Sequence, residues 1–417
     1  MVDNLTTQSG NSKNKIYKII GISLGIIVII SSIALNYFTK HSLYNGRIAD
    51  NIFIQDIEVS HMTKKEAVEA INKKYKPQNI NLNYNENNYE ISCDDINLKY
   101  NTEELVNKAY NSTRKESYFK DITSYIGIKF SGKKYSIESS YDEAKLDEAI
   151  GNIAKKIDRS PKNATVSVGS SISYTQSQTG LKFETEENKK LITEALDNKK
   201  YEDIDLKVAV TNPRVSTSDV KAINTKLASF STTFNSALVE RSYNIGLAAQ
   251  RCSNVILLPG ETFSYNKQTG MRVLSNGFKN ASVIVAGSYQ DAPGGGVCQT
   301  STTLFNAALL SGLQIDEVRN HSKTSHYVPR GRDAMVNDSG SDLKFTNNFD
   351  HAVYVQCYRS GSSVSAAIYG ASQDKVKTNI RVDKFTYNGL PGAKTYRTIT
   401  KNGKSETSYI YTSVYQE

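Results

Sequence analysis

The sequence is poor in several residue types, and these shortages exclude some classes of protein. Its 417 residues include only four cysteines, too few for a scaffold built on disulfides. Tryptophan is absent and only seven prolines occur, and so little proline rules out collagen-like and low-complexity chains. No C-x-x-C or H-E-x-x-H motif is present, so we predict neither a metal centre nor a cofactor.

The residues that are present indicate a folded, basic protein. Hydrophobic residues make up 38% of the chain and aromatic residues 9%, which is incompatible with full disorder. At roughly 150 residues per domain, the length predicts two or three domains. The 26 tyrosines favour exposed sheets. The net charge of +9 suits an anionic partner, and nucleic acid, anionic lipid and anionic cell-wall polymer all qualify.

The longest uncharged run lies near the N-terminus. Residues 19–38 carry no charge and, as a helix, would span about 30 Å, the thickness of a bilayer core. Lysines precede the run, so the positive-inside rule places residues 1–18 in the cytoplasm and the rest of the chain outside, facing the cell wall. We predict an uncleaved single-pass membrane anchor, with a cleaved signal peptide as the alternative. Because this prediction places most of the chain outside the cell, nucleic acid is no longer the leading candidate partner.

Beyond the apolar run the hydrophobic pattern predicts an α+β fold. Thr63 and Glu66 form a capping-box pattern that opens a helix. Alternating apolar residues over 80–93 predict a hairpin, and apolar residues at helical spacing over 141–157 predict an amphipathic helix. Further helices are expected over 218–230, 235–251 and 299–310, and a hairpin around Asn402-Gly403.

Two changes along the chain suggest domain limits. The segment 211–214, Thr-Asn-Pro-Arg, breaks the α+β pattern, and the chain becomes strand-like toward its C-terminus. We predict an α+β region over 41–212, a second α+β domain over 213–360 and a β-rich C-terminal extension over 361–417.

Cys298 is the cysteine whose surroundings favour chemistry. It follows Gly294-Gly295-Gly296 and immediately precedes a predicted helix. A helix N-terminus lowers the pKa of a thiol and offers free N–H groups as an oxyanion hole, and the glycines let a substrate approach closely. The alternative is a buried thiol or half of a disulfide, since four cysteines allow three full pairings.

The other three cysteines are predicted to serve packing. Cys93 and Cys357 each continue an alternating apolar run, as small buried hydrophobic residues do. Cys252 follows a predicted helix, and the partial negative charge of a helix C-terminus disfavours a thiolate.

A thiol nucleophile needs a base, and the five histidines of the chain limit the choice. The segment 319–333 holds His321, His326, three arginines and Asp333. We predict a histidine of this segment as base, Asp333 as the group that orients it, and an arginine as a carboxylate clamp. A solvated basic loop is the alternative.

Several segments of the chain resemble the VanW domain family over about residues 230–358. They are Pro-Gly-Glu-Thr-Phe-Ser-Tyr-Asn at 259–266, Gly-Gly-Gly-Val-Cys-Gln-Thr-Ser-Thr-Thr-Leu at 294–304, His321-Ser322, Tyr-Val-Pro at 327–329, Gly-Arg-Asp-Ala at 331–334 and Asp-Leu-Lys-Phe at 342–345. Upstream, residues 105–110 and 141–146 resemble a peptidoglycan-binding domain that often precedes VanW. The resemblance implies that 41–212 binds peptidoglycan and that 213–360 is the catalytic domain.

Resemblance to VanW-domain proteins of Gram-positive bacteria implies an L,D-transpeptidase distinct from the YkuD type. Cys298 occupies the position of the family cysteine and His321 that of the family histidine, so His326 ranks second as base. The implied reaction is attack on the third residue of a peptidoglycan stem tetrapeptide, loss of the terminal D-Ala and transfer to a neighbouring stem. The expected catalytic residues are Cys298, His321 and Asp333, and the expected substrate-binding residues are Arg332, Gly295, Gly296, Gln299 and His326.

Two other functions stay open at this point. With water as the acceptor, the same site would act as an L,D-carboxypeptidase. Without chemistry, the anchored basic ectodomain would bind the glycan strands and stem peptides of the wall as a non-catalytic protein.

Overall fold

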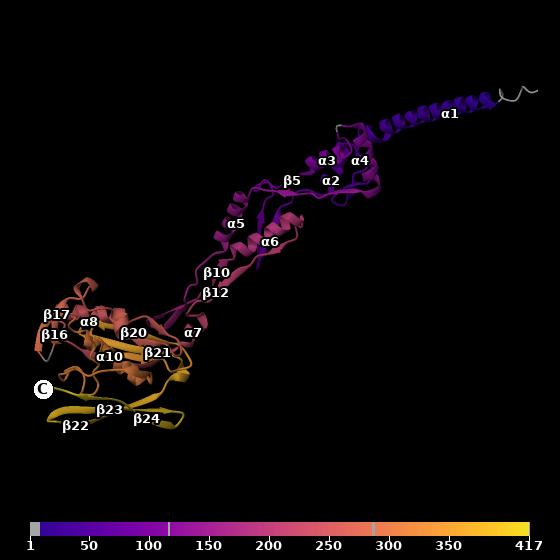
Figure 1. The fold of residues 1–417 in the computed structure, drawn as a ribbon. Helices are drawn as coiled ribbons and strands as arrows, with labels where there is room; N and C mark the ends of the chain where they lie inside the picture. Colours follow the sequence, from indigo (N-terminus) through magenta and orange to yellow (C-terminus); the bar gives the residue numbers. More distant parts are fainter. Residues whose placement is uncertain (1–8, 116, 286–287, 417) are drawn as a thin grey trace, which may run out of the picture. The chain divides into compact units, whose positions relative to one another are not determined.

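The computed structural model describes residues 9–115, 117–285 and 288–416 (Figure 1). Mixed helices and strands confirm the α+β prediction. The chain forms two compact units, one of residues 1–158 with 182–209 and the other of residues 159–181 with 210–417. Of the predicted cytoplasmic tail, residues 1–8 lie outside the described part.

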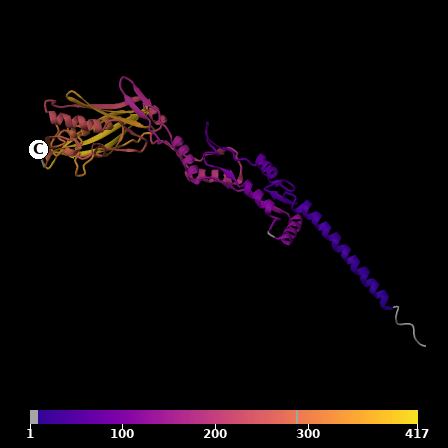
Figure 2. The same ribbon diagram turned by 90° about the horizontal axis from the view of Figure 1, so that it is seen from above.

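The predicted apolar helix is present near the N-terminus. Helix α1 spans Ser9–Phe38 and continues as one π-helical turn, η1 (Thr39–Leu43). Its apolar side chains are exposed, and no other element lies along it in either view of the ribbon (Figures 1 and 2). Among the described residues this is the one helix long and apolar enough to cross a membrane, a property that a signal sequence shares.

The rest of the first unit combines small sheets with five helices. Its elements are β1 (Ile52–Ile54), β2 (Ile57–Glu58), α2 (Lys64–Lys74), β3 (Ile80–Tyr84), β4 (Asn87–Ile91), β5 (Lys99–Tyr100), α3 (Thr102–Asn111), α4 (Tyr118–Ser131), β6 (Lys133–Tyr135), β7 (Ser139–Ser140), α5 (Glu143–Ile157), α6 (Thr185–Asn198) and β11 (Ile204–Asp205). Strands β10 (Gly180–Phe183) and β12 (Val208–Thr211) lie where the chain passes between the units.

Local sequence signals explain several of these elements. Thr63 and Glu66 exchange side chain-to-backbone hydrogen bonds at the start of α2, as the capping-box pattern predicts. The apolar positions of α5 are its buried ones, Leu146, Ile150 and Ile153 among them. Strands β3 and β4 form the predicted hairpin.

The second unit is built on antiparallel sheets. Its elements are β8 (Thr165–Val168), β9 (Ile172–Thr175), α7 (Thr217–Ala222), β13 (Thr225–Thr233), α8 (Val239–Arg251), β14 (Val255–Leu257), β15 (Thr262–Ser264), α9 (Tyr265–Thr269), η2 (Leu274–Asn276), β16 (Asn280–Val285), β17 (Ser288–Pro293), α10 (Val297–Ser311), β18 (Gln314–Glu317), β19 (Lys344–Thr346), β20 (Val353–Ser360), β21 (Ser363–Gly370), η3 (Ser372–Asp374), β22 (Lys377–Tyr387), β23 (Leu390–Lys401) and β24 (Lys404–Val414).

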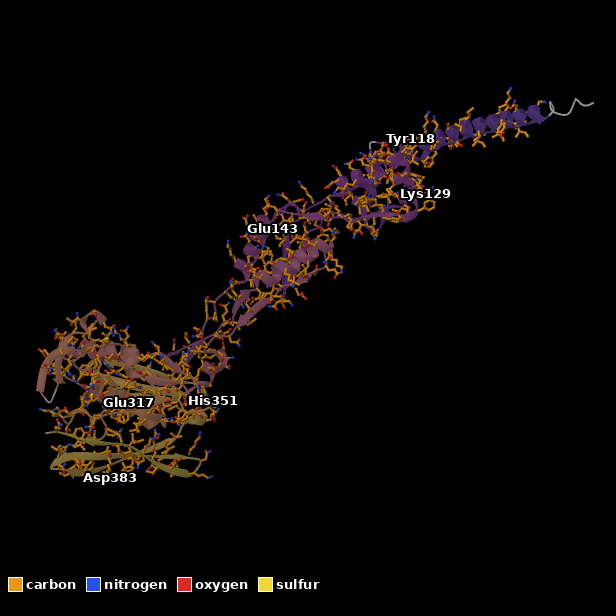
Figure 3. The ribbon with its side chains drawn as sticks, viewed as in Figure 1. Tyr118, Lys129, Glu143, Glu317, His351 and Asp383 are labelled. Atoms are coloured by element: carbon orange, nitrogen blue, oxygen red, sulfur yellow. The ribbon has the colours of Figure 1, made fainter. Side chains whose placement is uncertain are left out.

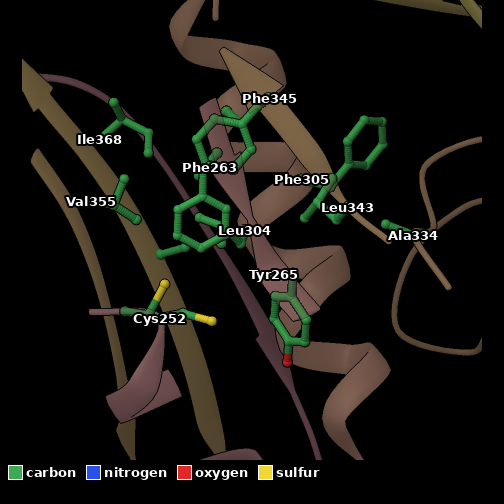
Figure 4. Packing of buried hydrophobic residues seen from close by; sticks show 14 of the residues in the cluster. Cys252, Phe263, Tyr265, Leu304, Phe305, Ala334, Leu343, Phe345, Val355 and Ile368 are labelled. Atoms are coloured by element: carbon green, nitrogen blue, oxygen red, sulfur yellow. The ribbon is translucent and has the colours of Figure 1, made fainter. Parts of the chain in front are cut away.

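The core of this unit encloses helix α10. Four strands pair in the order β13-β21-β20-β14, and β22, β23 and β24 form a separate three-stranded sheet. Helix α10 packs against β13 and β21, and 13 of its 15 residues are buried. Phe263 and Phe345 stack at 4.7 Å between ring centroids within the same core (Figure 4). A helix buried on nearly all sides holds its first turn in a fixed position.

One predicted helix of this unit is wrong. The spacing over 218–230 predicts a helix, but the helix α7 ends at Ala222 and residues from Thr225 form strand β13. Strand β13 pairs along its whole length with β21, more than a hundred residues away in sequence. A long-range partner therefore overrides the local pattern.

All four cysteines are free thiols, so no disulfide forms among them. Cys252 and Cys357 are buried in the core of the second unit, as packing residues are (Figure 4 labels Cys252). Cys93 is only half-buried and follows strand β4 instead of continuing it, so its predicted burial is wrong.

Candidate active site

Cys298 is the second residue of α10, and the two glycines before it shape the entry to the helix. Gly296 is the N-cap residue with φ of +105°, a conformation that favours glycine. A Cβ atom on Gly295 would lie 2.6 Å from the backbone of Ala281, and one on Gly296 would lie 2.9 Å from Cγ of Arg241. Close packing against the protein's own chain therefore requires glycine at both positions. That the two glycines also contact the substrate stays a prediction.

Two backbone N–H groups at this helix start find no acceptor in the part of the chain that the structure describes. The amides of Val297 and Gln299 donate to the carbonyls of Gly294 and Gly296 at 3.1 and 3.0 Å. The amides of Gly296 and Cys298 donate to no acceptor among the described residues. These groups could stabilise the oxyanion that forms on a substrate carbonyl oxygen when the sulfur attacks its carbon.

The structure brings Cys298, His321 and Asp333 together. Nδ1 of His321 lies 2.7 Å from Oδ2 of Asp333, and the backbone N–H of His321 donates to the same oxygen at 2.7 Å. Sγ of Cys298 donates to the backbone carbonyl of Val336 at 3.4 Å and is also within hydrogen-bonding reach of the other side of the His321 ring. The ring therefore stands between the sulfur and a carboxylate that is 1% exposed.

The pKa shifts of this group follow from its hydrogen bonds. Burial raises the pKa of the Cys298 thiol, but the hydrogen bond and positive charge of His321, together with the Val336 hydrogen bond and the charge of Arg272, outweigh burial and lower it. Burial favours the neutral ring of His321, yet hydrogen bonds to Asp333 and Cys298 raise its pKa to about 10. Both shifts favour a thiolate–imidazolium pair, the reactive form of a nucleophilic cysteine.

Asp333 is held by the C-terminal part of the chain. Its Oδ1 accepts a hydrogen bond of 2.6 Å from Tyr415, which follows β24, and its backbone carbonyl accepts one of 2.8 Å from Tyr411 on that strand. The β-rich extension thus fixes the group that orients His321.

The other predicted residues lie further from the sulfur or are engaged elsewhere. Gln299 is 1% exposed and donates through Nε2 to Thr232 and Thr233, so it ties α10 to β13. Nε of Arg332 donates to Asn306 at 2.6 Å, about 12 Å along α10 from Cys298 at 1.5 Å per residue. His326 is exposed and has no hydrogen bond to the part of the chain that the structure describes.

Two residues near the sulfur were missed by the sequence analysis. The Tyr327 hydroxyl lies 3.5 Å from Nε2 of His321, with its ring edge-on to the imidazole, and burial raises the pKa of that hydroxyl. Arg241 of α8 donates through Nη2 to Oε1 of Gln299 at 2.9 Å. Tyr327 belongs to a quoted family segment, which could have marked it, whereas no local pattern marks Arg241.

No metal site accompanies this arrangement in residues 9–115, 117–285 and 288–416. There, no group of three or more His, Cys, Asp or Glu side chains could hold a metal ion. The residues beside Cys298 are suited to proton transfer and to binding an oxyanion.

The α+β unit that holds Cys298, His321 and Asp333 therefore has a candidate thiol site for acyl transfer. Residues 240–369 match the family described as "VanW like protein", and residues 89–205 match the family described as "Putative peptidoglycan binding domain". The chain therefore contains a VanW-like domain and a domain of that second family, which confirms both resemblances.

Two curated relatives match part of the chain. It is 39% identical over 170 residues to the uncharacterized protein YoaR of Bacillus subtilis (strain 168), covering 40% of this chain and 55% of that protein. It is 29% identical over 113 residues to the vancomycin B-type resistance protein VanW of Enterococcus faecalis (strain ATCC 700802 / V583), covering 26% of this chain and 41% of that protein. The chain thus spans about half the length of these relatives. No solved structure gives a significant match.

Proposed function

We propose that this chain is a membrane-anchored, extracytoplasmic L,D-transpeptidase that forms 3–3 crosslinks in peptidoglycan. The observation that carries the proposal is the hydrogen-bonded series of Cys298, His321 and Asp333 at the start of α10. The two domain matches support a substrate in the cell wall. The apolar helix α1 supports an anchor with the second unit outside the membrane.

In the first step, the thiolate of Cys298 attacks the carbonyl carbon of the third residue of a donor stem. The amides of Gly296 and Cys298 would hold the oxyanion. The bond to the nitrogen of the terminal D-Ala breaks, and His321 gives its proton to that leaving amine. The product is a thioester at Cys298, and free D-Ala leaves the site.

In the second step, the side-chain amine of a neighbouring stem's third residue attacks the thioester. His321 accepts the proton of the incoming amine, and Cys298 leaves as the thiolate. Asp333 keeps Nδ1 of His321 engaged, so Nε2 faces the reacting atoms throughout. Water in place of the amine would give an L,D-carboxypeptidase.

Intact-mass spectrometry of the full chain in detergent, incubated with a disaccharide tetrapeptide, tests the proposal. We expect a covalent adduct of the donor minus D-Ala, located at Cys298, and 3–3 dimers as product. Cys298→Ala should still bind wall polymer but form neither adduct nor dimer. Cys93→Ala removes the half-buried thiol of the other unit and should behave like the wild type.

Two outcomes would contradict the proposal. Dimers formed by Cys298→Ala would exclude the thioester route. Binding of wall polymer by the wild type with neither adduct nor product would favour the non-catalytic wall-binding alternative.

A further inference from the structure

Arg241 lies against two residues that flank the nucleophile, Gln299 and Gly296. Its Nη2 donates to Oε1 of Gln299 at 2.9 Å, and its stem lies so close to Gly296 that a Cβ there would be 2.9 Å from its Cγ. Gln299 and Gly296 are the residues one after and two before Cys298. The guanidinium is therefore fixed beside the start of α10, within electrostatic reach of the sulfur.

Within the described part of the chain, the Arg241 guanidinium has no carboxylate partner. Among the described residues it forms no ion pair, and it is half-buried. By contrast, the nearby Arg272 is paired with Asp338 at 2.5 Å and bonded to Asn266. A guanidinium withdrawn from water without a carboxylate is costly unless an anionic ligand completes it.

The position of Arg241 fits one chemical group of the proposed donor. In a peptide that ends one residue after the bond to be broken, the terminal carboxylate carbon is three bonds from the attacked carbonyl carbon. A guanidinium beside the nucleophile can therefore bind that carboxylate through two parallel N–H···O hydrogen bonds. Arg332 is less well placed, because its Nε is bonded to Asn306 two turns further along α10.

We propose that Arg241 binds the α-carboxylate of the donor's terminal residue and so restricts the enzyme to stems with a single residue beyond the attacked carbonyl. This inference rests on the proposed function. A longer stem would present a neutral amide to Arg241 in place of the carboxylate. Arg241 is then a specificity-determining residue of the site.

Alkylation of Cys298 tests the charge without any peptide. Iodoacetate carries a carboxylate and iodoacetamide a neutral amide, and the Cys298 thiolate attacks the same CH2–I carbon of each, with loss of iodide. We expect the ratio of the iodoacetate rate to the iodoacetamide rate to fall about ten- to a hundredfold in Arg241→Gln. It should stay near the wild-type value in Arg241→Lys, which keeps the charge. An unchanged ratio in a folded Arg241→Gln would overturn the proposal.

Donor peptides separate this inference from the proposed function. With a terminal carboxylate we expect acylation of the wild type at Cys298, and much slower acylation of Arg241→Gln. With a terminal primary amide the two proteins should acylate at similar rates. If the alkylation ratio falls but no donor acylates the wild type, the anion site stands and the transpeptidase proposal fails. If donors acylate both proteins with the same preference for the carboxylate, the role of Arg241 fails alone.

A second observation concerns helix α4 of the first unit. Three of its large apolar side chains are exposed, Phe119 at 76%, Ile126 at 47% and Phe130 at 84%. Their spacing of seven and four residues places them on one face of the helix, while Tyr125 on another face is buried. An apolar stripe of this kind in a folded protein marks a contact surface.

The contacts of α4 place this stripe beside the end of the anchor. The Tyr44 hydroxyl, just beyond η1, donates to Asp121 of α4 at 2.7 Å. The ring of Phe38, the last residue of α1, packs edge-on against Tyr125 at 5.2 Å. Figure 3 labels Tyr118 at the start of α4 and Lys129 near its end. If α1 spans the bilayer, α4 lies at the level of the lipid headgroups.

We infer that the α4 stripe inserts into the outer membrane surface, with lipid as its occupant. This rests on the proposed anchor. Because the chain has no tryptophan, a single introduced tryptophan reports only on its own position. Phe119→Trp in the full chain, reconstituted in phosphatidylcholine vesicles, should emit at shorter wavelength and be quenched by brominated lipid.

Lys120→Trp is the matched control, because it moves the probe one residue along the same helix, away from the stripe. It should be quenched much less than Phe119→Trp. Equal quenching of the two variants, or none for Phe119→Trp in protein that co-floats with the vesicles, would overturn the inference. Protein that does not float at all would instead contradict the anchor.

Discussion

At the scale of single residues, the site is stabilised by the charge that His321 carries. Its pKa of about 10 lies above the ordinary value of 6.5, because hydrogen bonds to Asp333 and Cys298 outweigh the opposing effect of burial. A group whose pKa is raised by folding adds stability that is fully present below about pH 6.5 and is lost as the pH rises through about 10.

We therefore expect the melting temperature of the wild type to exceed that of His321→Gln most at or below pH 6.5. The difference should shrink steadily as the pH approaches 10. Calorimetry from pH 5 to pH 10 measures it, with His326→Gln as the control, because His326 is exposed. A difference that does not change with pH would show that His321 stabilises the fold by packing alone.

The residues of the site also show how far the sequence alone can lead. Cys298, His321 and Asp333 could be selected because their types and surroundings point to thiol chemistry, and the structure places them in contact. Arg241 could not, since its importance arises only where α8 packs against the start of α10. Arg332, one of the arginines of the predicted cluster 319–333, donates instead to Asn306 in the middle of α10.

At the scale of elements, the C-terminal strands matter to the site although the sequence marks them only as an extension. The hydroxyl of Tyr415 donates to Oδ1 of Asp333 and accepts from the backbone N–H of Gly331 at 2.8 Å. It is fully buried. Removing that hydroxyl leaves one oxygen of a buried carboxylate without its donor.

Tyr415→Phe should lower the free energy of unfolding by about 1.5–3 kcal/mol, the usual value for a hydrogen bond to a charged group. It should also slow alkylation of Cys298 by iodoacetamide, because Asp333 would hold His321 less firmly. Tyr409→Phe is the control, since that residue is 55% exposed on β24. Chemical denaturation of the two variants measures the first effect, and equal losses would contradict it.

The elements that the sequence predicts are those with local causes. The hairpin of β23 and β24 turns at Asn402 and Gly403, both with positive φ, as an Asn-Gly pair requires. Strand β13 was predicted as helix because its pairing with β21 depends on residues that are distant in sequence. The pattern of local hydrophobicity contains no information on such a partner.

At the scale of the whole molecule, the two compact units do not divide at one point of the chain. Residues 159–181 belong to the second unit although 182–209 return to the first. Within the second unit, Ala164 and Val166 are buried in a cluster with Val220, Tyr354 and Tyr369. Removing residues 159–181 therefore exposes this apolar face of the sheet that contains β20 and β21.

A fragment that starts at the predicted limit, residue 213, should therefore be less stable than one that starts at residue 159. Exposing a buried valine costs about 1.5–3 kcal/mol, which corresponds to a fall of about 5 °C in melting temperature for a chain of this size. Val166→Asp in the longer fragment should reproduce most of that fall, because a charge cannot enter the cluster. Equal melting temperatures for the two fragments would mean that residues 213–417 form a complete unit without residues 159–181.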